Sequence, residues 1–302
     1  MEEFSGAKNP VVTIGIFDGV HVGHRKILSR LLESAKEIDG EAVLLSFFPH
    51  PRVVLQPDSG ELRLINTLDE KISLLSDLGL QHVIIHPFDL EFSNIPSDIF
   101  IKEILVEKLK TKRLVIGYDH RFGKDRSGSF EQLRRDGEKY HFEVEEIPAQ
   151  DIQQINISSS KIRNALIEGD IIMANEFLGY QYFLRGIVVR GDQIGRKMNF
   201  PTANIFIEEK YKLIPREGVY AVEVKIRNSW YSGMLNIGHK PTFPGKDFSI
   251  EVHILNFNEE IYGQSIQLNF VKRIRDEIKF ENLNALEEQL KRDKETIKSI
   301  LK

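Results

Sequence analysis

The sequence predicts two domains in series: an α/β domain built on a doubly wound parallel sheet, then a small antiparallel barrel or sandwich. In the first part of the chain, short apolar runs of strand length alternate with amphipathic helical patterns. After Gly179 this alternation stops, and strand-like runs separated by Gly, Pro and Asn follow one another. The length of 302 residues also exceeds what one hydrophobic core usually supports. We therefore expect domains at residues 1–180 and 181–302.

The elements of the first domain follow from hydrophobic periodicity. Short apolar runs predict buried strands at 11–17, 42–48, 82–86, 113–117 and 142–147. Amphipathic patterns between these runs predict helices at 24–38, 71–78, 97–110 and 130–140. Strands that are apolar on both faces and connected by helices are typical of a parallel sheet covered on both sides. Two more helical patterns, at 160–168 and 171–178, end the domain.

The second domain shows a different pattern. Alternating or continuous apolar runs predict strands at 183–190, 219–226, 231–237, 250–257 and 266–271. The spacing of these runs is that of a small antiparallel barrel or a sandwich, and the runs alone do not choose between the two. A long amphipathic pattern at 282–301 predicts one closing helix.

Composition narrows the class of protein. Hydrophobic residues make up 41% of the chain and charged residues 28%, as in ordinary globular proteins. No run approaches the roughly 20 apolar residues of a membrane span, and the first residues do not resemble a signal peptide. The chain has no Cys, which excludes disulfide frameworks, zinc ribbons and thiol nucleophiles. We expect a cytoplasmic enzyme or binding protein.

The charge argues against a general nucleic-acid binder, because the net charge is −4. Residues 1–180 carry 21 Lys and Arg against 29 Asp and Glu, a net of −8, and the remaining residues carry 20 against 16, a net of +4. This asymmetry fits two domains but is too small to indicate a polyanionic partner.

The turn after the first predicted strand combines three glycines with two histidines. Gly15 and Gly19 allow the backbone to approach a ligand closely, and the start of the next helix offers free N–H groups and a positive dipole end. His21 and His24 at that helix start can both donate to phosphate oxygens, and Gly23 leaves room for a nucleotide base or ribose. The alternatives are surface histidines in a turn or a metal-binding pair. The place after the first strand of an α/β sheet favours a phosphate site.

A second candidate phosphate site lies at the end of the first domain. Ser158, Ser159 and Ser160 resemble an N-cap cluster that opens a helix, and Arg163 lies on the helix face above that cap. Hydroxyl groups, free N–H groups and a guanidinium suit a pyrophosphate or a flavin phosphate. The alternative is a capped helix with a solvated Arg.

The second domain has its own candidate site in the loop after its first strand. Gly195, Arg196 and Lys197 form a loop that can close on phosphates. In an extended stretch Thr202 and Asn204 point to the same side, so that a hydroxyl and an amide oxygen can share one Mg²⁺. The alternative is a hairpin loop with polar turn residues.

Glu251 begins an alternating stretch near the end of the chain. It shares one strand face with His253 and Leu255. Its carboxylate is therefore either a surface charge or a group directed into a pocket.

These motifs resemble a known family. The residues Phe-Asp-Gly-Val-His-x-Gly-His at 17–24 are similar to the His-x-Gly-His signature of nucleotidyltransferases, in the form found in bacterial bifunctional riboflavin kinases/FMN adenylyltransferases, or FAD synthetases. Similar segments of that family follow at 46–52, 117–123 and 157–163. In the second domain, Pro-Thr-Ala-Asn at 201–204 resembles the riboflavin kinase signature. Segments 251–255 and 274–280 and the closing helix also fit that family.

The resemblance implies a Rossmann-like N-terminal FMN adenylyltransferase domain and a C-terminal riboflavin kinase domain, a small antiparallel β-barrel with a C-terminal helix. It implies phosphorylation of riboflavin to FMN and adenylylation of FMN to FAD with release of pyrophosphate. ATP is then the co-substrate of both steps, Mg²⁺ the metal, and FMN and FAD are product and substrate. The partners implied are these small molecules, with no nucleic acid and no membrane, for a monomer or a weak homo-oligomer.

The resemblance also implies roles for particular residues. Those expected to be catalytic are Glu251 as general base, His21, His24 and Arg163. Those expected to bind ATP or phosphate are Gly15, Phe17, Asp18, Gly19, Gly23, Ser158, Ser159, Ser160, Gly195, Arg196 and Lys197. Asp119 and Arg275 are expected at the flavin, and Thr202 and Asn204 at the metal.

Two residues depart from the family pattern, and two other functions remain alternatives. Asn199 stands where the family often has Gly, and His120 where it usually has an aromatic residue. Asn tolerates a positive φ, so we expect the kinase to be active.

One alternative is that only the adenylyltransferase site is fully active, and the other is a non-catalytic flavin-binding protein. An aminoacyl-tRNA synthetase is disfavoured, because a Lys-Met-Ser-Lys-Ser signature is missing and the first domain is acidic.

Overall fold

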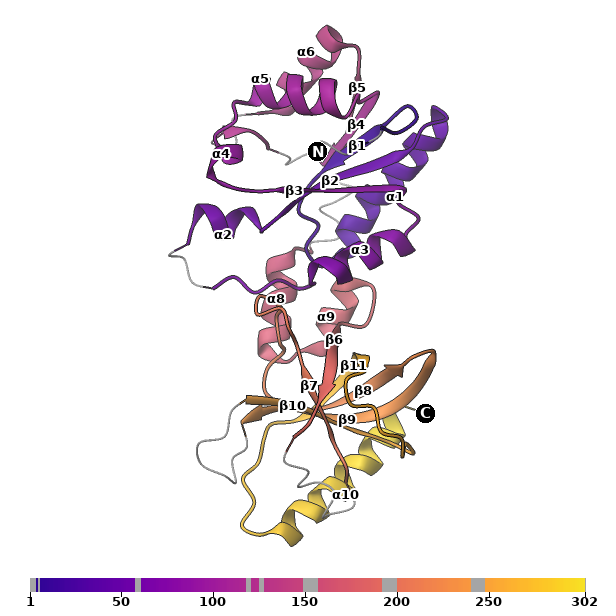
Figure 1. Ribbon diagram of the computed structural model, residues 1–302, viewed down its shortest axis with the longest axis vertical. Coiled ribbons are helices and arrows are strands. Elements are labelled where there is room, and N and C mark those ends of the chain that lie inside the picture. The colour runs from indigo at the N-terminus through magenta and orange to yellow at the C-terminus, as the bar shows by residue number, and fades with distance from the viewer. Residues whose placement is uncertain are drawn as a thin grey trace. The chain divides into compact units, whose positions relative to one another are not determined.

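The computed structural model describes residues 4, 6–57, 61–117, 121–124, 128–148, 157–191, 200–239 and 248–301. The chain divides into two compact units, Met1–Ser159 and Ser160–Lys302 (Figure 1). The structural boundary after Ser159 precedes the domain boundary that we predict near residue 180. Residue 180 lies just before the first strand of the barrel, and we keep it as a proposed boundary between functional domains.

The first unit is built on a five-stranded parallel sheet in the order β3-β2-β1-β4-β5. Its strands are β1 (Val11–Ile14), β2 (Ala42–Phe48), β3 (His82–Pro87), β4 (Arg113–Gly117) and β5 (Glu143–Ile147). This order confirms the predicted doubly wound α/β fold. The strand order reverses at β1, between β2 and β4, and ligands of such sheets bind at the carboxyl ends of the strands beside this reversal.

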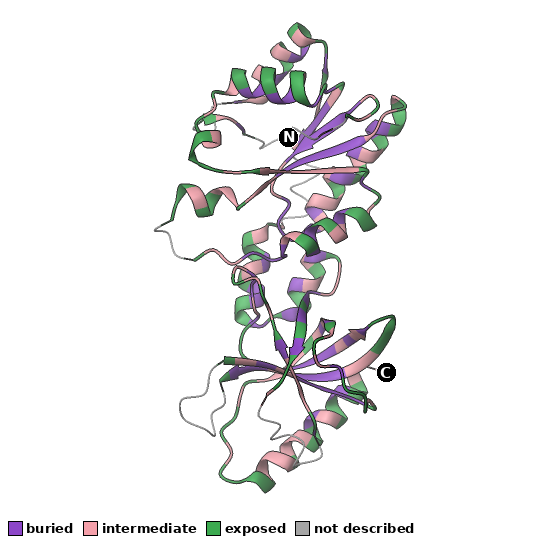
Figure 2. Ribbon diagram, viewed as in Figure 1, coloured by how far each residue is buried: buried purple, intermediate pink, exposed green. Residues whose placement is uncertain are grey.

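Helices cover both faces of this sheet. They are α1 (Val22–Glu37), α2 (Pro51–Leu55), α3 (Leu68–Asp77), α4 (Leu90–Ser93), α5 (Ser97–Ile99), the π-helix η1 (Phe100–Lys108) and α6 (Phe130–Tyr140). Neighbouring residues of β1 face opposite cores: Val11 packs with Leu28 and Leu31 of α1, and Val12 with Ile101 of η1. The central strands β1, β2 and β4 are accordingly largely buried, whereas the edge strands β3 and β5 are partly exposed (Figure 2).

The first unit differs from the prediction in its first strand, in the helix expected over 97–110 and in two short helices. The first strand ends at Ile14 rather than at residue 17, because the chain turns at Gly15 and Phe17 has a φ of 52°. The helix expected over 97–110 is α5 continued by a π-helix, which hydrophobic periodicity does not distinguish from an α-helix. The short helices α2 and α4 were not predicted, since four or five residues carry no periodic signal.

The second unit begins with two helices and closes into a barrel. The helices are α8 (Ser159–Glu168) and α9 (Ile171–Leu178). The strands are β6 (Phe183–Val189), β7 (Ala203–Phe206), β8 (Gly218–Ile226), β9 (Ser229–His239), β10 (Phe248–Ile254) and β11 (Ser265–Arg275). They form a closed barrel in the order β10-β7-β6-β11-β8-β9, with antiparallel pairing throughout. The barrel, not the sandwich, is therefore the correct alternative.

The closing helix α10 (Leu283–Ile300) packs against the outside of the barrel, as expected for an amphipathic helix. Its Ile297 shares a cluster with Phe200, Val219 and Met234. Asn282 caps its first turn by accepting from the backbone of Ala285 at 2.9 Å.

Candidate functional site

The first candidate site is the histidine turn, residues 15–24, at the carboxyl end of β1. The turn needs Gly15, because a Cβ there would lie 2.6 Å from the ring of Phe17. It also has three residues with positive φ: Phe17 at 52°, Gly19 at 88° and Val20 at 37°. Non-glycine residues rarely adopt such values, and backbone of this kind is found where surrounding contacts hold it in place.

The two histidines of this turn are held against each other. His21 is the N-cap of α1, and its Nδ1 accepts from the backbone N–H of His24 at 3.3 Å. When neutral, the His21 ring therefore carries its proton on Nε2, because Nδ1 is the acceptor of the capping bond. The two rings stack with centroids 3.6 Å apart, and a Cβ at position 23 would lie 3.2 Å from the His21 ring, so a larger residue there would push that ring by a few tenths of an ångström.

His24 lies in an environment that favours its neutral form. Burial, followed by the positive charges of His21 and Lys71, holds the pKa of His24 well below its ordinary value. Its Nδ1 is buried and has no hydrogen-bond partner among the described residues. Phe17 packs against the same ring, with centroids 4.8 Å apart. An unpaired buried ring nitrogen at a helix start suits a ligand that completes its hydrogen bonding.

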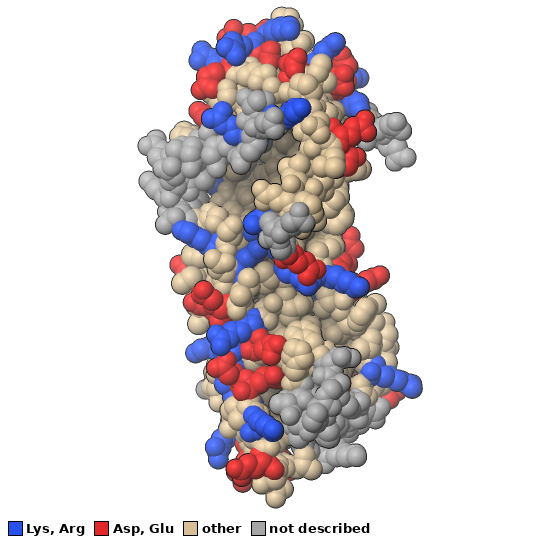
Figure 3. Space-filling view, turned by 90° about the vertical axis from the view of Figure 1, so that its left-hand side faces the viewer, with Lys and Arg blue, Asp and Glu red and all other residues tan. Residues whose placement is uncertain are grey.

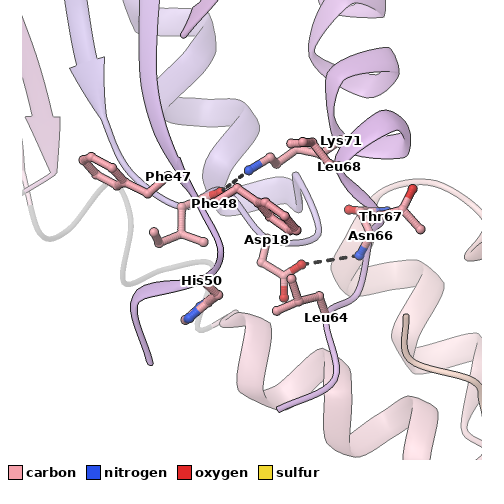
Figure 4. Close-up of a pocket in the computed structure, with 10 residues that line it drawn as sticks. Asp18, Phe47, Phe48, His50, Leu64, Asn66, Thr67, Leu68 and Lys71 are labelled. Atoms are coloured by element: carbon pink, nitrogen blue, oxygen red, sulfur yellow. Dashed lines mark hydrogen bonds between the residues drawn. The ribbon is translucent and has the colours of Figure 1, made fainter. Parts of the chain in front are cut away.

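Asp18 has a different environment from the one expected for a phosphate contact. Its carboxylate is buried and accepts from the backbone N–H of Ile65 at 3.0 Å and of Asn66 at 3.3 Å (Figure 4). Its backbone oxygen accepts from the hydroxyl of Ser159 at 2.9 Å. The side chain thus fastens the turn to the loop before α3, and a direct contact of Asp18 with phosphate stays a prediction.

Lys71 was not predicted to have a role, and the structure places it in the pocket beside Asp18 (Figure 4). Its ammonium donates to the Ser46 hydroxyl at 3.0 Å and to the Ile16 carbonyl at 3.3 Å. Burial lowers the pKa of Lys71 to about 8, and the charge of Asp18 opposes this shift. One feature of the sequence indicated that Lys71 would be buried: it lies four residues before Leu75, on the core face of α3.

Within the first unit, Ser159 of the serine cluster contacts the histidine turn. Ser159 bonds Asp18 as described, and Ser158 precedes it in the same unit. Ser160 and Arg163 lie on α8 within the second unit, Ser160 exposed and Arg163 half-buried. Asp119 and His120 lie outside the described residues.

The second candidate site joins two strands of the barrel. In the register of β10 with its neighbours, Glu251 lies opposite Asn204 of β7 and opposite Asn236 of β9. The hydroxyl of Thr202 donates to Glu251 Oε2 at 3.0 Å, and the hydroxyl of Ser249 lies 3.3 Å from Oε1. Thr202, Asn204 and Glu251 therefore share one face; the sequence predicted the common side of Thr202 and Asn204 but not the position of Glu251 beside them.

Residues around this face hold the extended segment in place. His253 Nδ1 donates to the carbonyl of Pro201 at 2.8 Å, and its ring packs against Phe200 with centroids 5.2 Å apart. Burial, assisted by the charge of Lys294, lowers the pKa of His253. The amide of Asn204 packs so closely on Gly191 that any side chain at position 191 would force Asn204 to move.

A cavity of about 500 Å³ borders Thr202. No local pattern of the sequence indicates this cavity, because its walls come from three separate segments. Its lining residues are Val188, Pro201, Thr202, Ala203, Val252, Ile254, Phe257, Asn258, Glu259, Glu260, Ile261 and Tyr262. Aromatic and aliphatic walls with a few polar groups suit a planar ligand that also carries charge. Gly195, Arg196, Lys197 and Asn199 lie outside the described residues.

Arg275, expected at the flavin, forms an ion pair with the closing helix. Its Nε and Nη2 donate to Asp293 Oδ2 at 3.0 and 2.7 Å, and its Nη1 donates to the Asp276 carbonyl at 2.9 Å. Gln289 completes the bonding of the buried Asp293 at 2.8 Å. The guanidinium thus fastens β11 to α10, and a contact of Arg275 with flavin stays a prediction.

Comparison with known proteins relates both units to described families. Residues 4–161 match the family FAD synthetase, and residues 178–301 match the family riboflavin kinase. The bifunctional riboflavin kinase/FMN adenylyltransferase of Bacillus subtilis is 38% identical over 290 residues, which cover 94% of this chain and 90% of the relative. The protein of the same name from Escherichia coli K12 is 36% identical over 287 residues, covering 95% and 91%.

A solved structure, described as a macrolide-efflux protein from Streptococcus pneumoniae, has nearly the same fold. It superposes with a TM-score of 0.89 and 30% identity over 98% of this chain and 96% of that one. Among the described residues, no helix combines the length and the apolar character that crossing a membrane requires. Each of the two family matches contains one of the candidate sites.

Proposed function

Because this chain belongs to the family of bifunctional riboflavin kinases/FMN adenylyltransferases, we propose that each of its two candidate sites performs one of the family's two reactions. The chain is an ATP-dependent transferase that phosphorylates riboflavin to FMN and adenylylates FMN to FAD. The observation that carries the assignment of sites is that the histidine turn lies within the FAD synthetase match and Glu251 within the riboflavin kinase match. We keep residues 1–180 and 181–302 as the proposed functional domains.

In the proposed adenylyltransferase site, an oxygen of the FMN phosphate attacks the α-phosphorus of ATP. A new O–P bond forms, the bond from the α-phosphorus to the bridging oxygen breaks, and pyrophosphate leaves. The nucleophile is already ionised at neutral pH, so the site needs no strong base. Its work is alignment and stabilisation of charge, which His21 Nε2–H, the neutral His24 and the N–H groups at the start of α1 perform.

The other predicted groups of this site have supporting roles. Gly15, Gly19 and Gly23 allow the phosphates to approach the backbone. The hydroxyls of 158–160 and the guanidinium of Arg163 hold the departing pyrophosphate or the flavin phosphate. Asp119 contacts the flavin, as the family resemblance implies.

In the proposed kinase site, Glu251 is the general base. It takes the proton of the terminal ribityl hydroxyl of riboflavin, whose oxygen then attacks the γ-phosphorus of ATP and displaces ADP. The bonds from Thr202 and Ser249 hold the carboxylate in one orientation before the substrate arrives. Hydroxyls need such a base and phosphates do not, which is why a carboxylate is required here and not in the histidine turn.

The residues of this face fit Mg²⁺. Thr202 and Asn204 offer a hydroxyl and an amide oxygen beside the Glu251 carboxylate, and hard oxygen donors are the ligands that Mg²⁺ takes. The ion, when bound there, neutralises charge on the transferring phosphates. The cavity bordered by Phe257 and Tyr262 receives the base of ATP. The loop with Gly195, Arg196 and Lys197 closes on its phosphates, and Arg275 orders the segment at the flavin.

The proposed setting is the cytoplasm, where ATP is available, with riboflavin, FMN and ATP as the partners of a monomer or weak homo-oligomer. Charge supports small ligands over a polyanion: on the face shown in Figure 3, basic and acidic side chains of the described residues are intermixed. The net charge of −4 agrees with this.

The test is a time course with purified protein, riboflavin, ATP and Mg²⁺, followed by separation of the flavins. The proposal predicts that FMN appears first and FAD second, with one ADP and one pyrophosphate released per FAD. FAD from supplied FMN but none from riboflavin would support the alternative in which only the adenylyltransferase site is active. A yellow protein that consumes no ATP would show a flavin-binding protein and overturn the proposal.

A further inference from the structure

The pocket beneath the histidine turn contains two buried charges of opposite sign, Asp18 and Lys71 (Figure 4). Both act on the same stretch of backbone. Lys71 donates a hydrogen bond to the carbonyl of Ile16. Two residues further along, the side chain of Asp18 accepts hydrogen bonds from the backbone N–H groups of Ile65 and Asn66. Between these two fixed points lies Phe17, whose φ is positive and whose ring packs on His24.

We propose that Lys71 is a positioning residue for adenylyl transfer: together with Asp18 it clamps the histidine turn so that His21 and His24 face the reacting phosphates. This inference rests on the proposed function of the turn. Lys71 reaches the turn from α3, and Ser46, its other partner, lies on β2. Three segments distant in sequence therefore meet at one ammonium.

The clamp explains a backbone that is otherwise unfavourable. Positive φ values at Phe17 and Val20 persist only where neighbouring contacts outweigh their cost. The hydrogen bond that Lys71 donates to the Ile16 carbonyl and the one that the Asp18 carboxylate accepts from Ile65 are such contacts on either side of Phe17. A relaxed turn would move the two imidazoles, and a displacement of about 1 Å in a site that works by alignment costs on the order of 10²-fold in rate.

Charge is a second link between Lys71 and the site. The groups that face His24 are His21 and Lys71, and both lower its pKa in addition to burial. The group that faces Lys71 is Asp18, which opposes the lowering of the lysine pKa. Removing the ammonium therefore raises the pKa of His24, an effect that a lysine with a purely structural role elsewhere would not have.

The test uses the full chain and the variants Lys71→Met and Lys71→Met/Asp18→Asn. The second variant removes both charges, so no uncompensated carboxylate is left buried, while Asn retains an acceptor for Ile65. FAD formation from FMN and FMN formation from riboflavin are measured on the same samples. We expect kcat for FAD formation to fall by about 10- to 100-fold in both variants, with FMN formation unchanged. Lys36→Met, at an exposed lysine of α1, is the matched control and keeps both activities.

A second readout follows the ring of His24 by NMR across a pH titration, and its midpoint is expected at higher pH in Lys71→Met. Normal FAD formation by either folded variant, or an unmoved His24 midpoint, would overturn the inference. Loss of folding in both variants would also overturn it, since Lys71 would then be required for folding alone. If the unaltered chain makes no FAD from supplied FMN, the proposed function fails instead.

Discussion

The histidine turn and the face formed by Thr202, Asn204 and Glu251 are each proposed to handle a phosphate transfer, but they are built in different ways. In the first, the proposed catalytic groups come from ten consecutive residues of one turn, 15–24, whose backbone is unfavourable on its own. In the second, Thr202 and Glu251 are far apart in sequence, and the antiparallel register of β7 and β10 brings them together at 3.0 Å. The turn thus needs contacts from outside to keep its shape, whereas the strand pair supplies its own geometry.

The two proposed sites also differ in the nucleophile that each must use. In the proposed mechanism the attacking phosphate of FMN is already ionised, and the turn offers the neutral His24, the His21 ring and helix N–H groups to stabilise charge. The attacking hydroxyl of riboflavin must lose a proton, and the barrel offers a carboxylate. The comparison predicts that each reaction fails alone when its own site is altered.

The largest expected effect is at Glu251. Glu251→Gln keeps the shape and the contact with Thr202 but cannot accept a proton at neutral pH. We expect FMN formation to fall by about 10²- to 10⁴-fold, the range of a lost general base, and conversion of supplied FMN to FAD to stay unchanged. Steady-state assays of both reactions check this. Equal loss of both activities would indicate misfolding, and loss of neither would make Glu251 an ordinary surface residue.

The histidines come next. His24→Ala is expected to lower FAD formation by about 10²- to 10³-fold and to leave riboflavin phosphorylation intact. His21 needs a more careful substitution, because it also caps α1. His21→Asn keeps a capping acceptor but lacks the imidazole, so its loss of FAD formation should match that of His21→Ala. An active His21→Asn would reduce His21 to a helix cap.

The third prediction concerns the ion pair between Arg275 of β11 and Asp293 of α10. Asp293→Ala leaves the guanidinium of Arg275 without its partner in a largely buried place. The cost expected for breaking a buried ion pair is about 3–5 kcal/mol of unfolding free energy. Trp230, the single Trp of the chain, lies on β9 and reports unfolding of the second unit alone. Fluorescence unfolding in urea therefore measures the effect, and an unchanged midpoint would mean that α10 is held by its apolar contacts.

The fourth prediction sharpens where the kinase domain begins. Asn175 of α9 donates to the Phe270 carbonyl at 2.8 Å and accepts from the Tyr182 backbone at 2.7 Å. A fragment of residues 181–302 loses both bonds, and a fragment of 160–302 keeps them. We expect both to make FMN, with the shorter less stable by about 1–3 kcal/mol. If neither phosphorylates riboflavin while folded, the barrel site needs residues from the other unit.

The smallest effect is on pH dependence. Burial lowers the pKa of both His24 and His253 from the ordinary value of 6.5. As the pH falls through 6.5, the unfolded chain binds protons that the folded chain does not, so stability decreases. In the second unit His253→Gln, which does not titrate but can still donate to Pro201, should flatten this decrease between pH 7 and pH 5. An equally steep decrease in the variant would assign it to other groups.

Local patterns accounted for most of the fold. The parallel sheet follows from short apolar runs, and β2, β4, α6 and α9 have the predicted bounds. The choice between barrel and sandwich could not be made, because the strand that completes the barrel, β7 (Ala203–Phe206), has four residues and no apolar run. Its pairing with both β6 and β10 is a tertiary property.

The candidate sites were predictable as far as their residues are close in sequence or share a strand face. His21 and His24 belong to one motif, and the alternation around Glu251 is visible in the sequence. The partners that orient them are not: Asp18 bonds Ile65 across 47 positions, and Lys71 bonds Ser46 across 25. Such contacts arise from the winding of the chain around the sheet, which no local pattern records.

The central claim is that two separate sites in one chain perform the two reactions in sequence. It is tested most directly by mixing two variants, each inactive at one site, with riboflavin, ATP and Mg²⁺. Glu251→Gln alone should leave riboflavin unchanged, and His24→Ala alone should stop at FMN. Because FMN can diffuse from one molecule to the other, the mixture should produce FAD. Failure of the mixture while each variant keeps its remaining activity, or FAD formation by either variant alone at the normal rate, would contradict the claim.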